Sequence, residues 1–312
     1  MTASAEAGHN LLVEEGSPDN YAHASRLEHA AASNHWCVGR LPTYGVAVPI
    51  PFPELRALLD DQVRSVQTIL GRDLIGFYIV GSFAVGDADL SSDCDFIAVV
   101  RHPLSSRQED DLRALHRGIP SRNGLWPKNL EGSYAPLDDL RTLDALGRRW
   151  LYVDRGWSEM QWSTHCNSLE QRWTLREFAV VLTGPRARTF AAPIPGALLG
   201  AAMAERLPRL LDDLATWIDI DAVAWGQRYA LESLCRMYWT FTDGKVHSKA
   251  ASLDRAVGTF DPRWADLLRQ AQADRSLPWN PNEPPREGNA TLTRAFALEV
   301  LDRVSRETTP AR

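Results

Sequence analysis

The stretch Gly76–Val100, GFYIVGSFAVGDADLSSDCDFIAVV, constrains the fold more than any other part of the chain. It opens within an apolar run, Ile75–Val80, which is short enough to form one buried strand rather than a helix. Gly81-Ser82 ends this strand, and a second apolar run, Phe96–Val100, follows within the same stretch. The stretch therefore predicts two buried strands joined by a glycine-containing connection.

Two carboxylates stand at the head of the second strand. Asp93 and Asp95 are separated by Cys94. Because side chains along a strand alternate between faces, the two carboxylates point the same way and Cys94 points away. Carboxylates held this close repel each other unless one is protonated or a cation lies between them. A pair of oxygen ligands suits Mg²⁺, which favours one or two carboxylates together with substrate phosphates.

This arrangement resembles the nucleotidyltransferase fold of the polymerase-β superfamily. The resemblance rests on Gly81-Ser82 after the first strand, on Ser92-Asp-x-Asp-Phe at the second, and on the spacing of eleven residues between Ser82 and Asp93. In that superfamily the Gly-Ser pair opens a short helix whose backbone N–H groups hold a nucleotide phosphate. The resemblance implies that Gly81, Ser82 and Ser92 bind the nucleotide, and that Asp93 and Asp95 bind Mg²⁺ and serve catalysis.

A third strand is predicted over residues 129–135, NLEGSYA, and it carries Glu131. Transfer of a group to a hydroxyl needs a base to accept the proton, and a positioned base contributes roughly 10²–10⁴-fold. The superfamily resemblance implies a third carboxylate on the neighbouring strand, so Glu131 is the predicted catalytic base. Asp138 and Asp139 are the alternatives.

Helical periodicity dominates the rest of the chain. In the first half it predicts helices over residues 53–70, 105–116 and 170–181. After Gly196 no convincing strand remains, and five segments have helical spacing, namely 197–218, 222–242, 248–257, 262–273 and 290–305.

These patterns predict a chain of two domains. The fold class is an α/β N-terminal nucleotidyltransferase domain, a small mixed sheet with flanking helices, followed by an all-α C-terminal helical bundle. The expected boundaries are 1–50 for a partly disordered N-terminal extension, 51–180 for the nucleotidyltransferase domain and 181–312 for the helical domain.

A second resemblance covers part of the helical half. Arg228-Tyr229 through Cys235-Arg236-Met237-Tyr238-Trp239, then Thr242-Asp243-Gly244-Lys245 and Lys249, look like the C-terminal domain of the streptomycin/spectinomycin adenylyltransferases. Leu182-Thr183-Gly184-Pro185 resembles a Leu-x-Gly-Pro of the same family. The resemblance implies that Lys249 reaches the triphosphate of ATP.

One departure from that family concerns the acceptor. Where those enzymes carry an acidic residue linked to holding the cationic drug, this chain reads Trp225-Gly226-Gln227. A cationic aminoglycoside would then need other groups, such as Asp219 or Asp221, or the substrate differs.

The predicted function is Mg²⁺-dependent transfer of a nucleoside monophosphate, AMP from ATP, to a hydroxyl of a small molecule, an aminoglycoside-type antibiotic. One alternative is a nucleotidyltransferase acting on a biosynthetic intermediate or a protein side chain. The other is a non-catalytic nucleotide-binding protein. The sequence contains no G-x-x-x-x-G-K-[ST], G-x-G-x-x-G, H-E-x-x-H or G-x-S-x-G motif, which disfavours other enzyme classes.

Composition narrows the partners. A net charge of −6 and a pI near 5.8 argue against nucleic acid, whose binding depends on Lys and Arg neutralising phosphates. The four cysteines include no C-x-x-C pair and predict reduced thiols. With no signal-peptide pattern and no membrane-length apolar run, a cytoplasmic protein is expected, with a monomer favoured.

Tryptophans gather in the middle of the chain, at Trp150, Trp157, Trp162 and Trp173. Such rings can stack on a base or a sugar face. They can equally fill the core or the seam between domains, and the sequence leaves both interpretations open.

Overall fold

The computed structural model describes residues 50–90, 92–217, 220, 222–277, 280 and 282–308. These residues divide into two compact units. The sheet unit comprises residues 50–203 and 239–250, and the helical unit comprises residues 204–238 and 251–308. The boundaries at residues 50 and 180 remain predictions, since a compact unit in space need not be a folding domain.

The sheet unit is built on six strands in the order β5-β4-β3-β2-β1-β6. The pair β2–β3 is parallel, and the pairs β1–β2, β1–β6, β3–β4 and β4–β5 are antiparallel. The predicted mixed sheet is therefore confirmed, as is the fold class. The strands are β1 Leu74–Ile79, β2 Cys94–Val100, β3 Leu130–Pro136, β4 Trp150–Val153, β5 Met160–Ser163 and β6 Val180–Thr183.

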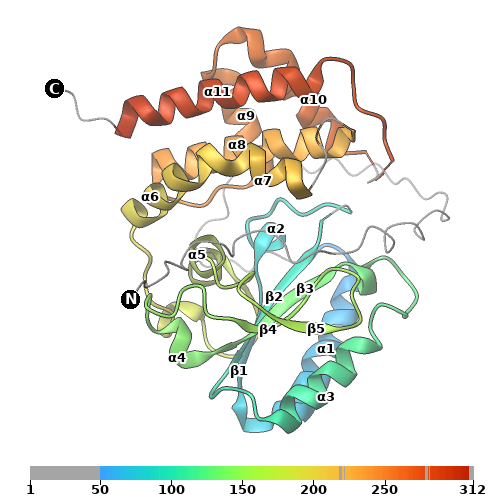
Figure 1. Cartoon of the computed structure of the whole chain (residues 1–312). Coiled ribbons are helices and arrows are strands. Elements are labelled where there is room, and N and C mark those ends of the chain that lie inside the picture. The colour runs from blue at the N-terminus through green and yellow to red at the C-terminus, as the bar shows by residue number, and fades with distance from the viewer. Residues whose placement is uncertain are drawn as a thin grey trace, which may run out of the picture. The chain divides into compact units, whose positions relative to one another are not determined.

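Helices cover both faces of this sheet (Figure 1). On one face, α1 (Pro53–Leu70) and α3 (Ser106–Arg117) pack through Leu59 and Leu112 against the inner strands. On the other face lie α4 (Leu137–Leu140) and α5 (Leu169–Phe178), which contributes Leu175. Burial of apolar side chains on both faces explains why the central strands read as continuous apolar runs.

The two long helices of this unit begin and end at the residues that the sequence signals. Pro53 is the first residue of α1, and Gly71 ends it with φ 55°. Ser105 caps α3: its Oγ accepts from the Gln108 N–H at 3.4 Å, while the Gln108 side chain accepts from the Ser105 N–H at 2.9 Å. These caps fix how the chain enters and leaves the layer behind the sheet.

A polar network is buried beneath that layer. His116 Nε2 lies 2.8 Å from the Tyr134 hydroxyl and 3.3 Å from Gln62 Nε2. The imidazole also stacks on Phe96, with ring centroids 5.8 Å apart and planes 7° apart. Burial lowers the pKa of His116 to about 3, so this ring is neutral in the folded protein.

The sheet departs from the sequence prediction at its two edges. The predicted helix over residues 170–181 is wrong at its end, because α5 stops at Phe178 and Val180–Thr183 forms β6, paired with β1. The strands β4 and β5 were not predicted either, since their four residues each are too short to display a period. Residues 150–183 therefore supply half of the strands.

Two of the four tryptophans lie in the core. Trp150 on β4 is fully buried, and Trp173 on α5 is 6% exposed. Trp162 lies on the outer strand β5 and donates from Nε1 to Glu109 at 3.2 Å, and Trp157 is half-buried. For Trp150 and Trp173, the core interpretation is the one that holds.

The helical unit holds most of the predicted helices. Its core joins Phe260, Trp264 and Phe296 in edge-to-face contacts. Its helices, some shared with the sheet unit, are α6 Gly196–Arg206, α7 Leu210–Trp217, α8 Ala224–Asp243, α9 Lys249–Thr259, α10 Ala265–Asp274 and α11 Asn289–Thr308. The predicted helix 197–218 is interrupted by a 3₁₀ turn, Leu207–Arg209, at Pro208.

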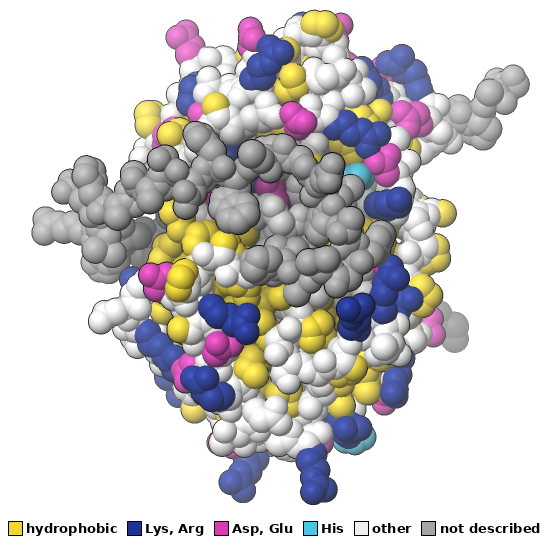
Figure 2. All heavy atoms as spheres, turned by 180° about the vertical axis from the view of Figure 1, so that it is seen from behind, with side chains coloured by type: hydrophobic (Ala, Val, Ile, Leu, Met, Phe, Trp, Pro, Cys, Tyr) yellow, Lys and Arg dark blue, Asp and Glu magenta, His cyan; other side chains and the backbone are white. Residues whose placement is uncertain are grey.

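The surface carries mixed charge. On the face drawn in Figure 2, Lys and Arg side chains stand in small groups among Asp, Glu and hydrophobic side chains, and the described residues form no extended basic stripe there. None of the described helices is both long enough and apolar enough to cross a membrane. The three described cysteines, Cys94, Cys166 and Cys235, are buried and free.

Candidate active site

The parallel pair of strands brings two predicted acids together. Asp95 is the second residue of β2 and Glu131 the second residue of β3, and the two are register partners. Asp93 lies immediately before β2 on the same side as Asp95. Glu131 is 7% exposed, so it is not the surface residue that a lone strand glutamate usually is. Three carboxylates thus converge at the amino ends of the parallel pair.

The predicted phosphate turn lies against these acids. Gly81 and Ser82 open α2 (Gly81–Ala84), directly after β1. Gly81 has φ 61°, and a Cβ at this position would collide with the Asp95 carboxylate. The Val80 N–H donates to the Asp95 carbonyl at 2.9 Å, which ties the turn to β2. The glycine is therefore required both for its backbone conformation and for its closeness to the acid.

Ser92 is engaged in a local turn. Its hydroxyl accepts from the Asp89 N–H at 2.9 Å and donates to Asp89 Oδ1 at 3.1 Å. This closed turn positions the residues just before Asp93. Binding of nucleotide by Ser92 remains a prediction.

The environment of the acids opposes their ionisation. Burial raises the pKa of Asp93 to about 6, although Arg155 Nη1, 2.8 Å from Asp93 Oδ1, acts in the opposite direction. Burial, followed by the charges of Glu131 and Asp93, raises the pKa of Asp95 well above its usual value. Stable ionisation of all the acids therefore needs added positive charge.

Lys249, the first residue of α9, supplies part of that charge. It belongs to the sheet unit, and its ammonium acts to lower the pKa of Asp93 and of Asp95. The next residue, Ala250, donates its N–H to Asp87 Oδ2 at 3.0 Å. Asp87 follows α2, so this hydrogen bond fastens the start of α9 to the connection that leaves the phosphate turn.

Sequence reasoning missed three polar residues of the site. Asp154 and Arg155 follow β4, whose last residue pairs with Gly132 beside Glu131. His165 lies in the turn between β5 and α5, and its Nε2 is 2.8 Å from Glu131 Oε1. All three follow strands that the sequence did not reveal, so their relation to Glu131 could not be predicted.

The two alternatives to Glu131 as the catalytic base form ion pairs away from the three carboxylates. Asp138 is exposed and pairs with Arg141 at 2.8 Å. Asp139 pairs with Arg148 at 2.9 Å and accepts from Trp150 Nε1 at 3.0 Å. Both belong to α4, which follows β3 at the opposite end from Glu131.

The residues predicted to concern the acceptor belong to the helical half of the chain. Asp219 and Asp221 lie outside the described residues. Gln227, in the segment that departs from the family, is 2% exposed and donates from Nε2 to the Ile220 carbonyl at 2.8 Å. Its amide nitrogen therefore binds the backbone of the helical unit, to which Gln227 itself belongs.

The donor set fits a divalent cation that also binds substrate. Among the described residues, no group of three or more His, Cys, Asp or Glu side chains is arranged to hold an ion alone. Asp93 and Asp95 provide two carboxylates whose repulsion a cation would relieve. Such a partial ligand set is what Mg²⁺ uses when phosphates complete its coordination.

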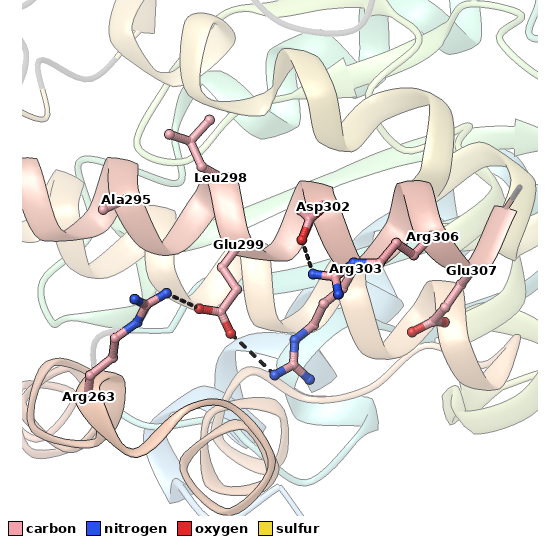
Figure 3. Close-up of a pocket in the computed structure, with 8 residues that line it drawn as sticks. All are labelled: Arg263, Ala295, Leu298, Glu299, Asp302, Arg303, Arg306 and Glu307. Carbon is pink, nitrogen blue, oxygen red and sulfur yellow. Dashed lines mark hydrogen bonds and ion pairs between the residues drawn. The ribbon is translucent and has the colours of Figure 1, made fainter.

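A cavity lies elsewhere, on α11 in the helical unit (Figure 3). It has a volume of about 620 Å³. Its acids are already paired, Glu299 with Arg263 at 2.7 Å and with Arg303 at 3.2 Å, and Asp302 with Arg306. We therefore assign the chemistry to the carboxylates of the sheet unit, whose charges are incompletely balanced. The cavity is lined by Arg263, Ala295, Leu298, Glu299, Asp302, Arg303, Arg306 and Glu307.

A mixed sheet with a Gly-Ser turn packed against acids on adjacent strands defines a nucleotidyltransferase fold. Residues 189–302 match the family profile of the aminoglycoside adenylyltransferase C-terminal domain. The predicted resemblance to the aminoglycoside nucleotidyltransferases is thereby confirmed over these residues, and the relatives described next extend it.

Those relatives have low sequence identity to this chain, but the matches cover most of its length. Spectinomycin 9-adenylyltransferases of Staphylococcus aureus, strains Mu50 and N315, are each 20% identical over 215 residues, covering 66% of this chain and 79% of theirs. The solved structure of a spectinomycin adenyltransferase from Enterococcus faecialis, with ATP and spectinomycin, has a TM-score of 0.60 at 15% identity. That match covers 79% of this chain and 99% of the other, and it shows the fold.

Proposed function

We propose that the chain transfers AMP from ATP to a hydroxyl of an aminoglycoside-type antibiotic in a Mg²⁺-dependent reaction. The observation that carries the proposal is the convergence of Asp93, Asp95 and Glu131 beside the Gly81-Ser82 turn. The family-profile match and the names of the relatives support the choice of ATP and of this acceptor class.

Nucleotide binding would use three parts of the sheet unit. The backbone N–H groups of the Gly81-Ser82 turn would donate to a phosphate, and the Lys249 ammonium would pair with the triphosphate. Asp93 and Asp95 would hold Mg²⁺, which when bound neutralises phosphate charge. The pairing of Arg155 with Asp93 at 2.8 Å would give way as the cation binds.

Glu131 would act as the general base. Its carboxylate is buried next to Asp95, and it would accept the proton of the acceptor hydroxyl as that oxygen attacks the α-phosphorus. The bond between the α- and β-phosphates breaks, and pyrophosphate leaves. The products are the adenylylated acceptor and pyrophosphate.

Two classes of acceptor molecule are considered. The relatives' names favour spectinomycin. Gln227 stands in the segment where the resemblance leads us to expect a drug-binding acid, and its buried side chain donates from Nε2 to the Ile220 carbonyl. This observation favours, as the second candidate, an acceptor that needs no acid there, such as a biosynthetic intermediate.

The test measures pyrophosphate release and the mass of the acceptor with ATP, MgCl₂ and either spectinomycin or streptomycin. We expect acceptor-dependent release that stops with EDTA, and a product heavier by AMP. Glu131→Gln should lower kcat by about 100-fold or more, whereas the matched control Asp138→Asn should stay within about two-fold. Binding of ATP with no product from any acceptor would overturn the proposal and favour a nucleotide-binding protein.

A further inference from the structure

His165 is a polar residue of the site that the mechanism above does not use. Its Nε2 lies 2.8 Å from Glu131 Oε1, which is hydrogen-bonding distance. The ring also stacks on Tyr152, with centroids 5.1 Å apart and planes 29° apart. Two independent contacts therefore fix the imidazole beside the predicted base.

The strand pattern explains why His165 meets Glu131. Asp95, Glu131 and Tyr152 all project from the same face of the sheet. Side chains alternate between faces along a strand, and these three lie in step with the residues of their strands that form the core on this face. Helix α5 packs on this face, and the turn leading into α5 carries His165 over it. The turn therefore covers the end of the sheet where the acids gather.

The turn itself is anchored on both sides of His165. The His165 N–H donates to Ser163 Oγ at 3.2 Å, and Cys166 is buried at 2% exposure. Asn167 donates from Nδ2 to the carbonyls of Ala145 at 2.8 Å and Arg148 at 2.9 Å. This anchoring holds the imidazole in place even though about half of its side-chain surface is exposed.

The charges around His165 favour a donating imidazole. Burial alone would lower its pKa, but the hydrogen bond to Glu131 and the charges of Glu131, Asp95 and Asp154 raise it to about 9. The ring is therefore a cationic donor near neutral pH, in a site where acids otherwise repel one another.

We propose that His165 is the positioning residue of the catalytic base: it binds one oxygen of Glu131 and leaves the other oxygen aimed at the acceptor hydroxyl. Without this bond, the Glu131 carboxylate would keep only its hydrogen bond with the Tyr152 hydroxyl against the repulsion by Asp95. The inference rests on the proposed function, because it assigns a partner to that reaction's base. It concerns the chemical step, not nucleotide binding.

The experiment compares steady-state kinetics of the full chain with ATP, MgCl₂ and spectinomycin across His165→Ala, His165→Gln, Glu131→Gln and the double variant. His165→Ala should lower kcat by about 10-fold or more and leave KM for ATP within about two-fold. His165→Gln, whose amide N–H can still donate, should recover most of that loss. His102→Ala, at an exposed histidine, is the matched control and should behave as wild type.

The double variant separates positioning from a general structural role. If His165 acts through Glu131, His165→Ala adds no further loss in the Glu131→Gln background. Additive losses, or a kcat of His165→Ala within about two-fold of wild type, overturn the proposal. Should His165→Ala fail to fold, the same comparison is made with His165→Gln and His165→Asn.

A measurement that does not depend on turnover distinguishes failure of the His165–Glu131 pairing from failure of the proposed function. In NMR titrations, the pKa of the His165 imidazole should fall by at least about one unit in Glu131→Gln. If the wild-type chain releases no pyrophosphate with any acceptor, the proposed function fails on its own. An unchanged His165 titration in Glu131→Gln overturns the pairing whatever the activity.

Discussion

Asp95 and Glu131 occupy partner positions on β2 and β3, the one parallel pair among the described strands. Parallel pairing places the amino ends of both strands at the same edge of the sheet. The carboxyl end of β1 meets this edge as well, because Ile79 pairs with Phe96, and so Gly81 is adjacent. Two strand pairings thus assemble the acids and the phosphate turn from segments about fifty residues apart.

Asp95→Asn tests the importance of the buried acid. Loss of one of two metal-binding carboxylates should reduce pyrophosphate release by at least about 100-fold. Since burial raises the pKa of Asp95, its ionised form is unfavourable in the metal-free protein, and the neutral amide should not lower Tm in EDTA. Wild-type Tm should rise on addition of MgCl₂ and ATP, and the variant's should rise much less. Equal turnover of the two proteins would remove Asp95 from the mechanism.

Gly81→Ala tests the fit between the phosphate turn and Asp95. A methyl group at Gly81 collides with the Asp95 carboxylate, so either the turn or the acid must move. We expect kcat/KM to fall by at least about 100-fold, measured by pyrophosphate release. Gly71→Ala is the control, because Gly71 also has positive φ but has no atom within 4 Å of a Cβ. That variant should lose about 1–3 kcal/mol of stability, because φ 55° and ψ −120° are unfavourable for alanine, and should keep its activity.

The central strands were predictable because burial on both faces leaves continuous apolar runs, as in Phe96–Val100. The position of Glu131 was predictable for a related reason, since its strand is bounded by turn residues and has clear alternation. The edge strands were not predictable. Val180–Thr183 follows a helix after one residue, and its first two residues read as the end of that helix.

His165 marks a second limit of sequence reasoning. Its contact with Glu131 spans 34 positions and depends on the β4–β5 hairpin. No alternation of apolar and polar residues in the sequence predicts that hairpin. A histidine in a turn has no local signal of its partner. The tryptophans drew attention to the same segment, but Trp150 and Trp173 are core residues. The polar residues between them are the ones that face the site.

Asp87→Ala tests the tether that holds the start of α9. The Asp87 carboxylate accepts the Ala250 N–H at 3.0 Å, next to Lys249. Loss of this bond should loosen the Lys249 segment and raise KM for ATP by about 3- to 10-fold, with a smaller effect on KM for the acceptor. Asp87→Asn retains an accepting oxygen and should stay close to wild type. If Lys249→Ala leaves KM for ATP unchanged, the segment does not bind the triphosphate.

The buried network of His116 makes a prediction about stability and pH that is independent of catalysis. The ring is 2% exposed and stays neutral, with its pKa lowered to about 3, whereas in the unfolded chain it takes up a proton below its ordinary value of 6.5. The unfolded state therefore binds more protons, and His116 makes stability fall as pH drops from 6.5 toward 3.

His116→Gln removes that titration while keeping a group that can bond Tyr134. Between about pH 7.5 and about pH 5.5, wild type should lose about 1.4 kcal/mol more of its unfolding free energy than the variant does. Urea unfolding at the two pH values measures this difference, and the contribution of His165 cancels because both proteins carry it. Parallel pH profiles would mean that the His116 ring becomes protonated inside the folded protein, at the expense of its contacts with Tyr134 and Gln62.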